Sequence, residues 1–236
     1  MTKYRVLLCI ALASALCSFS FYPQGNQIPV VEIAEPANGS TVTRGSVIAY
    51  KINVTDKEDG TSKYEEITQA EVFLKVKYLS SAKQVSAYIQ KENQFAKAFT
   101  IMRQSDCFNC HSVQQKLSGP SFRDIASKYG ASAATYERLS KKIMKGSRGV
   151  WSDSQQMPAH PKLKKDAALA LAKLVVHYGS DKNFELYTGT EGTISLKKNQ
   201  PKTSSSVLLL TASYLDHGIE LKNRKEGKAM VKLFLK

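Results

Sequence analysis

The stretch Cys107-Phe108-Asn109-Cys110-His111 is the part of this sequence around which the rest is organised. Cysteines at i and i+3 fall on one face of a helical turn, and a histidine follows them directly. A thioredoxin-like redox pair should follow a strand of a βαβ unit, whereas residues 92–105 predict a helix. A zinc site needs four closed ligands, and the mature chain has no second cysteine pair. A short disulfide is the remaining alternative.

This spacing is typical of a c-type haem attachment site. At such a site the thiols of Cys107 and Cys110 add to the two vinyl groups of one haem, and His111 is the proximal ligand of the iron. The sequence therefore predicts one covalently attached haem c as cofactor.

Helical periodicity surrounds the motif. An apolar stripe at i, i+3, i+4 and i+7 leads into it and consists of Phe95, Ala98, Phe99 and Met102. Two further helices are expected at residues 135–145 and 165–178, and Gly179 is the expected stop of the second. Met157 lies between these two helices, directly before Pro158, which cannot continue a helix. Met157 is therefore the expected second iron ligand, and His160 is the rival because neutral imidazole also binds iron.

The attachment motif, the methionine segment and the flanking helices, over residues 92–183, resemble a class I c-type cytochrome. The resemblance implies an all-α domain in which His111 and Met157 are the axial ligands of the iron. It also implies that the Pro120 carbonyl accepts the ring N–H of His111, and that Trp151 lies near a haem propionate.

Strand periodicity flanks this helical region on both sides. Residues 46–54 alternate, with Ile48, Tyr50, Ile52 and Val54 on the apolar face. Further strands are expected at residues 71–79, 193–197, 207–214 and 229–235, with the inner faces Val72, Leu74, Val76, Tyr78 and Val231, Leu233, Leu235. Residues 56–60 predict a solvated acidic turn, with a calcium site at Asp56, Glu58 and Asp59 as the alternative. A second turn is expected at Glu226-Gly227.

Neither group of strands suffices alone for a sandwich. Residues 27–80 resemble the opening strands of bacterial PKD-like or Ig-like domains, and residues 190–236 resemble their closing strands. We therefore expect an α+β protein in which the cytochrome domain, residues 92–183, is inserted into one β-sandwich. The alternative is a cytochrome flanked by a complete small β domain and a loose β tail.

Residues 1–22 predict a secretory signal peptide, with Lys3 and Arg5 before an apolar run too short to cross a bilayer. Periplasmic or other export is therefore expected. A lipid anchor on Cys17 is the alternative, and membrane association is expected only with that anchor.

The 236-residue chain has a formal net charge of +14. Nucleic acid is not expected as a partner of an exported chain. Residues 93–183 contain 15 Lys or Arg and 6 Asp or Glu. Lys141, Lys142, Lys145 and Arg148 approach the methionine segment, so we hypothesise a basic rim that steers an acidic redox partner; a solvated helix face is the alternative.

These features predict an exported monohaem electron carrier rather than an enzyme, with redox proteins as partners and a dehydrogenase as a candidate electron donor. Two alternatives stay open. One is a peroxidase-type enzyme with an open distal site, and the other is a β module that binds glycan or protein and carries the cytochrome as cargo.

Overall fold

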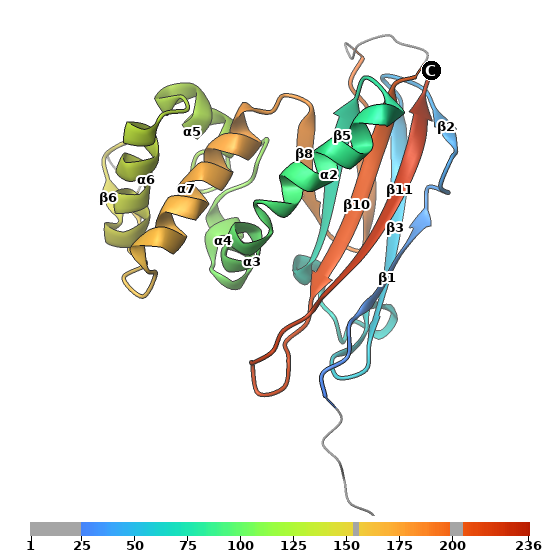
Figure 1. Ribbon diagram of the computed structural model, residues 1–236, viewed down its shortest axis with the longest axis horizontal. Coiled ribbons are helices and arrows are strands. Elements are labelled where there is room, and N and C mark those ends of the chain that lie inside the picture. Colours follow the sequence, from blue (N-terminus) through green and yellow to red (C-terminus); the bar gives the residue numbers. More distant parts are fainter. Residues whose placement is uncertain (1–24, 153–155, 199–204) are drawn as a thin grey trace, which may run out of the picture.

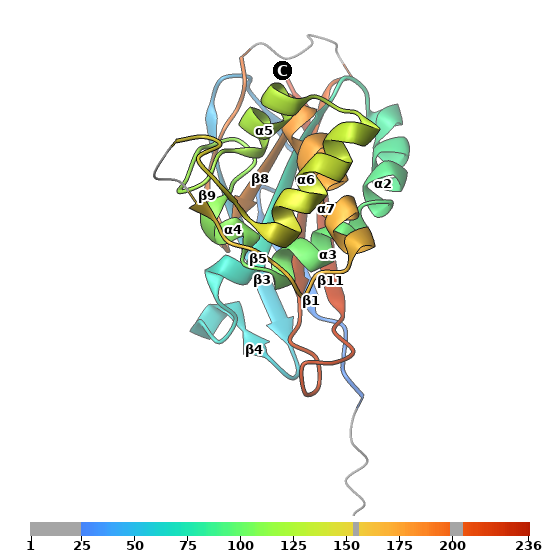
Figure 2. The same ribbon diagram turned by 90° about the vertical axis from the view of Figure 1, so that its left-hand side faces the viewer.

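The computed structural model describes residues 25–152, 156–198 and 205–236. Within them, two β-sheets pack face to face, and a block of helices lies against the outer face of the larger sheet (Figures 1 and 2). The expected signal segment, including Cys17, lies outside the described residues. Among the described helices, none combines the length and the apolar composition that a bilayer crossing requires.

The larger sheet has the strand order β2-β11-β10-β5-β8. Its neighbouring strands are antiparallel, except that β2 runs parallel to β11. The strands are β2 (Thr41–Val42), β5 (Val72–Leu79), β8 (Phe184–Thr188), β10 (Val207–Leu215) and β11 (Glu226–Leu235). The strands expected at residues 71–79, 207–214 and 229–235 are confirmed, and all three belong to this sheet.

The smaller sheet is built around β3, which pairs with the other three strands. These strands are β1 (Val30–Glu35), β3 (Val47–Asp56), β4 (Gly60–Thr61) and β9 (Glu191–Ser195). Strands that precede the helical block and strands that follow it therefore contribute to both sheets.

The sandwich core contains the side chains that the alternating pattern selects. Tyr50, Ile52 and Val54 from β3 are buried against Leu74 and Val76 from β5. Val231, Leu233 and Leu235 from β11 join the same cluster. The expected inner faces are thus confirmed, because a period of two places alternate side chains on one face of a strand.

The helical block lies between β5 and β8, which are neighbours in the larger sheet. Its two ends meet where the Tyr78 amide donates a 2.9 Å hydrogen bond to the Asn183 carbonyl. The helices are α2 (Val85–Asn93), α3 (Ala96–Gln104), α4 (Cys107–Cys110), α5 (Phe122–Tyr129), α6 (Ala133–Lys145) and α7 (Lys165–Ser180). Two short antiparallel strands lie in the connection between α6 and α7. They are β6 (Ser147–Arg148) and β7 (Gln156–Met157).

Two boundary predictions are wrong. Gly179 does not end α7; it lies within the helix where α7 crosses α5, and an added Cβ would overlap the Phe122 carbonyl. Glu226-Gly227 is not a turn but opens β11. There the Glu226 carboxylate accepts a 2.7 Å bond from Arg103 of α3, a partner distant in sequence, and Gly227 leaves space for the Pro29 backbone.

Buried charges join the helical block to the larger sheet. The Lys75 ammonium of β5 lies 2.8 Å from the Glu92 carboxylate of α2, which also accepts a bond from the Tyr178 hydroxyl of α7. Burial alone would raise the pKa of Glu92, but its contacts with His177, Lys75 and Tyr178 bring it down to about 2. A buried pair of this kind is held by its hydrogen bonds, and loss of one partner would leave an uncompensated charge.

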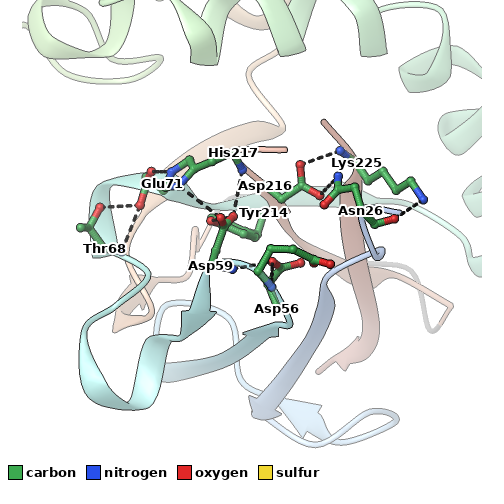
Figure 3. Close-up of polar contacts among 10 residues, drawn as sticks. Asn26, Asp56, Asp59, Thr68, Glu71, Tyr214, Asp216, His217 and Lys225 are labelled. Atoms are coloured by element: carbon green, nitrogen blue, oxygen red, sulfur yellow. Dashed lines mark hydrogen bonds and ion pairs between the residues drawn. The ribbon is translucent and has the colours of Figure 1, made fainter. Parts of the chain in front are cut away.

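A polar cluster lies at the end of the sandwich where β10 ends and β11 begins (Figure 3). The Asp59 carboxylate accepts hydrogen bonds from the Tyr214 hydroxyl at 2.7 Å and the His217 amide at 2.8 Å. Asp56 is not a solvated turn residue as expected; it is 4% exposed and accepts the amides of Glu58 and Asp59. Within the described ranges, no three His, Cys, Asp or Glu side chains converge to hold a metal ion.

The pair of His217 and Glu71 should make stability depend on pH. The bond to Glu71 raises the pKa of His217 against the opposing effect of burial, while the bonds from His217 and Thr68 outweigh burial and lower the pKa of Glu71. The His217 contribution is complete below its ordinary pKa of 6.5 and is lost as the pH rises through its higher folded pKa. The Glu71 contribution is complete above 4.5 and is lost as the pH falls through its lower folded pKa.

The free energies of unfolding of wild type and His217→Gln should be measured from pH 4 to 9. They should differ most between the ordinary pKa values of Glu71, 4.5, and His217, 6.5. The difference should be about 1 kcal/mol or less, because the pair is partly exposed. The difference should disappear at high pH. A difference that is constant across this range would contradict the ion pair.

Candidate functional site

The two motif cysteines lie on α4, a single helical turn. Its i and i+3 positions bring Cys107 and Cys110 to one side, where both thiols are free and line the same cavity. Burial, followed by the charge of Asp106, raises the pKa of Cys107 to about 11. A reactive redox cysteine requires the opposite shift, towards the thiolate. The thioredoxin-like alternative is therefore disfavoured.

The cavity has a volume of about 340 Å³, within the range of cofactor sites. Its wall is mostly apolar and is formed by side chains from α3, α5, α6 and α7, which the periodic apolar stripes of these helices bring together. These side chains are Met102, Phe122, Ile125, Leu139, Ile143, Leu171, Ala172 and Val175. Met102, from the expected apolar stripe, is buried and also contributes to this wall.

His111 follows α4 directly and lines the cavity. Its Nδ1 lies 2.7 Å from the Pro120 carbonyl oxygen. Because a carbonyl only accepts, Nδ1 carries the proton, and in the neutral ring Nε2 keeps a free lone pair. Burial lowers the pKa of His111, so the ring is neutral at pH 7. The structure thus brings together the two residues that the resemblance paired.

Gly119 makes this arrangement possible. A Cβ at Gly119 would lie 2.6 Å from Cε1 of the His111 ring, and the Gly119 amide donates a 2.8 Å bond to the Cys110 carbonyl. The glycine therefore lets the chain pass directly beside the imidazole.

Met157 lies on β7 and also lines the cavity. Its strand pairs with β6, with Ser147 opposite Met157. Gly146 adopts a φ of +74°, and a side chain there would lie 2.7 Å from the Met157 carbonyl. This glycine therefore permits the close pass of the two segments that places Met157.

His160, the rival ligand, has both ring nitrogens near oxygen atoms. Nε2 lies 2.7 Å from the Asp106 carboxylate, and Nδ1 lies 3.3 Å from the Ile143 carbonyl. The hydrogen bond with His160 lowers the pKa of Asp106. His160 thus connects the segment after Met157 to the residue before α4, a role that the sequence did not reveal because Asp106 is 54 positions away.

Trp151 lies at the mouth of the cavity and is 37% exposed. Its ring meets Tyr129 edge-on, with centroids 6.4 Å apart, and the Lys128 ammonium lies 4.4 Å from the indole centroid. Lys142 also reaches the cavity wall, whereas Lys141, Lys145 and Arg148 are exposed.

The donor set fits a covalently held haem. Two free thiols, a neutral imidazole with one nitrogen fixed, and a thioether all reach one apolar cavity, and each is a known point of attachment or ligation for haem. Fold and site together define a helical domain for covalent haem binding, combined with a β-sandwich.

Comparison with known proteins agrees with this class. The family model described as Cytochrome c matches residues 95–178. Cytochrome c-552 of Nitrosomonas europaea is 38% identical over 97 residues, which cover 40% of this chain and 84% of that protein. Cytochrome c-551 of Allochromatium vinosum is 38% identical over 68 residues, which cover 29% of this chain and 69% of that protein.

The crystal structure of Nitrosomonas europaea cytochrome c552 is similar over 34% of this chain and 96% of that chain, with 33% identity and a TM-score of 0.32. On the sequence comparisons, the chain belongs to the cytochrome c family. It is an electron-carrying monohaem cytochrome whose cofactor is covalently attached haem c.

Proposed function

We propose that Cys107 and Cys110 form the two thioethers to the haem, and that His111 and Met157 bind the iron. The observation that carries this assignment is that all four side chains reach one cavity while Pro120 holds Nδ1 of His111. The bound haem supplies a one-electron couple at its iron. The thioethers prevent loss of the cofactor, and the apolar wall excludes water around it.

Met157 is favoured over His160 by what each side chain already contacts. Both nitrogens of His160 have oxygen neighbours, so binding iron through either nitrogen would cost the polar contact that this nitrogen makes. The thioether of Met157 requires no such loss. A methionine opposite a histidine also raises the reduction potential, as suits an electron carrier.

Pro120 and Trp151 act on the haem indirectly in this proposal. A carbonyl that holds the Nδ1 proton orients the ring and makes the other nitrogen a stronger donor. The indole N–H of Trp151 at the mouth of the cavity can donate to a haem propionate. With Met157 on the iron no open position is left for a peroxide, so we favour electron transfer over peroxidase chemistry.

Covalent attachment is tested on the purified protein after maturation with haem. The unfolded polypeptide should keep its colour through extraction with acidified acetone, because thioethers survive that treatment. The double variant Cys107→Ser/Cys110→Ser should release the colour into the solvent. Release from the wild type would overturn the assignment.

The distal ligand is tested by Met157→Ala. The oxidised variant should lose the long-wavelength absorption band of the methionine–iron bond, and its midpoint potential should fall because the thioether no longer favours the reduced iron. Met144→Leu on α6 is the matched control, since Met144 is not among the cavity-lining residues. Absence of the band from the oxidised wild type, together with an unchanged potential in Met157→Ala and a changed potential in His160→Ala, would identify His160 as the ligand instead.

A basic rim around the cavity mouth is proposed as the docking surface for an acidic redox partner. Lys141, Lys142, Lys145 and Arg148 lie on α6 and β6, and no ion pair within the described ranges includes them. A dehydrogenase that reduces this cytochrome is a candidate partner. Charges on an exposed rim accelerate encounter rather than tighten the final complex.

This steering should depend on salt. Reduced protein should react with ferricyanide, an anionic oxidant, several-fold more slowly as the Debye length falls from about 30 Å at 0.01 M to about 8 Å at 0.15 M ionic strength. The double variant Lys141→Glu/Lys145→Glu should weaken this dependence, whereas Lys232→Glu on β11 should not. Equal salt dependence in all three proteins would contradict the rim.

For the remainder of the chain, we propose an Ig-like or PKD-like sandwich that is interrupted between β5 and β8 by the cytochrome domain. Support comes from the contribution of both β segments to both sheets. Tyr50 and Tyr78 are buried in the core, which favours a scaffold over a module that binds glycan through these rings. Export through the signal at residues 1–22, with a lipid anchor on Cys17 as the alternative, completes the proposal.

A further inference from the structure

β8 is an edge strand, and its outer edge faces the helical block. Among the strands of the described residues it pairs only with β5, so the backbone groups on its other side have no strand partner there. Unpaired edges of this kind are usually covered or charged in natural proteins. Here the cover comes from the loop that follows the haem-binding motif.

Gln114 takes the place of a neighbouring strand at this edge. Its side-chain amide donates from Nε2 to the Leu186 carbonyl at 3.0 Å, and its Oε1 accepts from the Leu186 amide at 3.3 Å. Two positions earlier in β8, the Phe184 carbonyl accepts a 3.0 Å bond from Nη2 of Arg123. Two side chains from the helical block thus satisfy three successive outward backbone groups of β8.

Gln114 belongs to the loop of residues 112–121, which runs from His111 to its hydrogen-bond partner Pro120. At its start the Ser112 carbonyl accepts the Phe122 amide at 2.9 Å, and Val113 is fully buried. At its end the Gly119 amide returns to the Cys110 carbonyl. Between these two fixed points, the amide of Gln114 fastens the loop to the sheet.

We infer that Gln114 is a positioning residue, through which the edge of the β-sandwich sets the placement of the Pro120 carbonyl against His111. The inference rests on the proposed function of His111 as an iron ligand. Gln114 is not among the residues that line the cavity. It acts on the iron ligand only through the loop.

Loss of the Gln114 anchor should change how strongly His111 donates to the iron. The bond from Nδ1 to the Pro120 carbonyl makes His111 a stronger donor, which favours the oxidised iron. If the loop loses its anchor on β8, this bond lengthens on average and His111 becomes a weaker donor. The reduction potential then rises.

The test uses the full-length, haem-loaded protein and the variants Gln114→Ala and Gln114→Leu, which keeps apolar volume without the amide. Both variants should show a higher midpoint potential than wild type. Amide hydrogen exchange at Gly119 and Phe122 should become faster, and the proton signal of His111 Nδ1 should shift. Gln115→Ala is the matched control, because Gln115 is exposed and its side chain makes none of these bonds.

A lower melting temperature with an unchanged potential and an unchanged His111 signal would show that Gln114 only stabilises the fold, and would overturn the inference. Wild-type values in Gln114→Leu would also overturn it, since packing alone would then suffice. Failure of the proposed role of His111 gives a different result, because the ring protons of His111 in the oxidised wild type would then lack the large paramagnetic shifts of an iron ligand, whatever residue 114 is.

Discussion

The antiparallel pairing of β5 with β8 is the constraint on which the rest of this structure depends. These strands are about a hundred positions apart, yet Val76 faces Glu185 and Lys77 faces Phe184 in continuous register. A sheet that pairs the two strands at the ends of a long insertion supplies the free energy for bringing those ends together. It also places the last strand of the sheet directly beside the loop that follows the motif.

Contacts between the sheet and the helices extend to the motif itself. Phe108, between the two cysteines, packs against Phe73 of β5 with ring centroids 5.0 Å apart. Arg103 of α3 reaches Glu226 of β11, and Lys75 of β5 reaches Glu92 of α2. Because these contacts are largely shielded from solvent, the haem-binding turn packs against the sandwich, and changes in the sandwich can reach the ligand environment.

Local patterns were sufficient for much of this architecture. The two periods, 2 for strands and 3.6 for helices, identify the inner faces of β3, β5 and β11 and the stripe of α3, because burial of one face is what creates each pattern. Neither α5 nor β8 was predicted from these patterns. Gly179 and Gly227 were misread because glycine serves both as a stop signal and as a place of close backbone approach.

For the site, the sequence by itself determined the chemical groups: two thiols at helical spacing, an adjacent imidazole, and a methionine before a proline. Chemistry of this kind is local, since it depends on residue types a few positions apart. Only the tertiary structure decided which groups share a cavity, that His160 is held by Asp106 and Ile143, and that Gln114 completes the edge of β8. These contacts join residues 17 to 72 positions apart, and no local pattern encodes which distant backbone atom a side chain will meet.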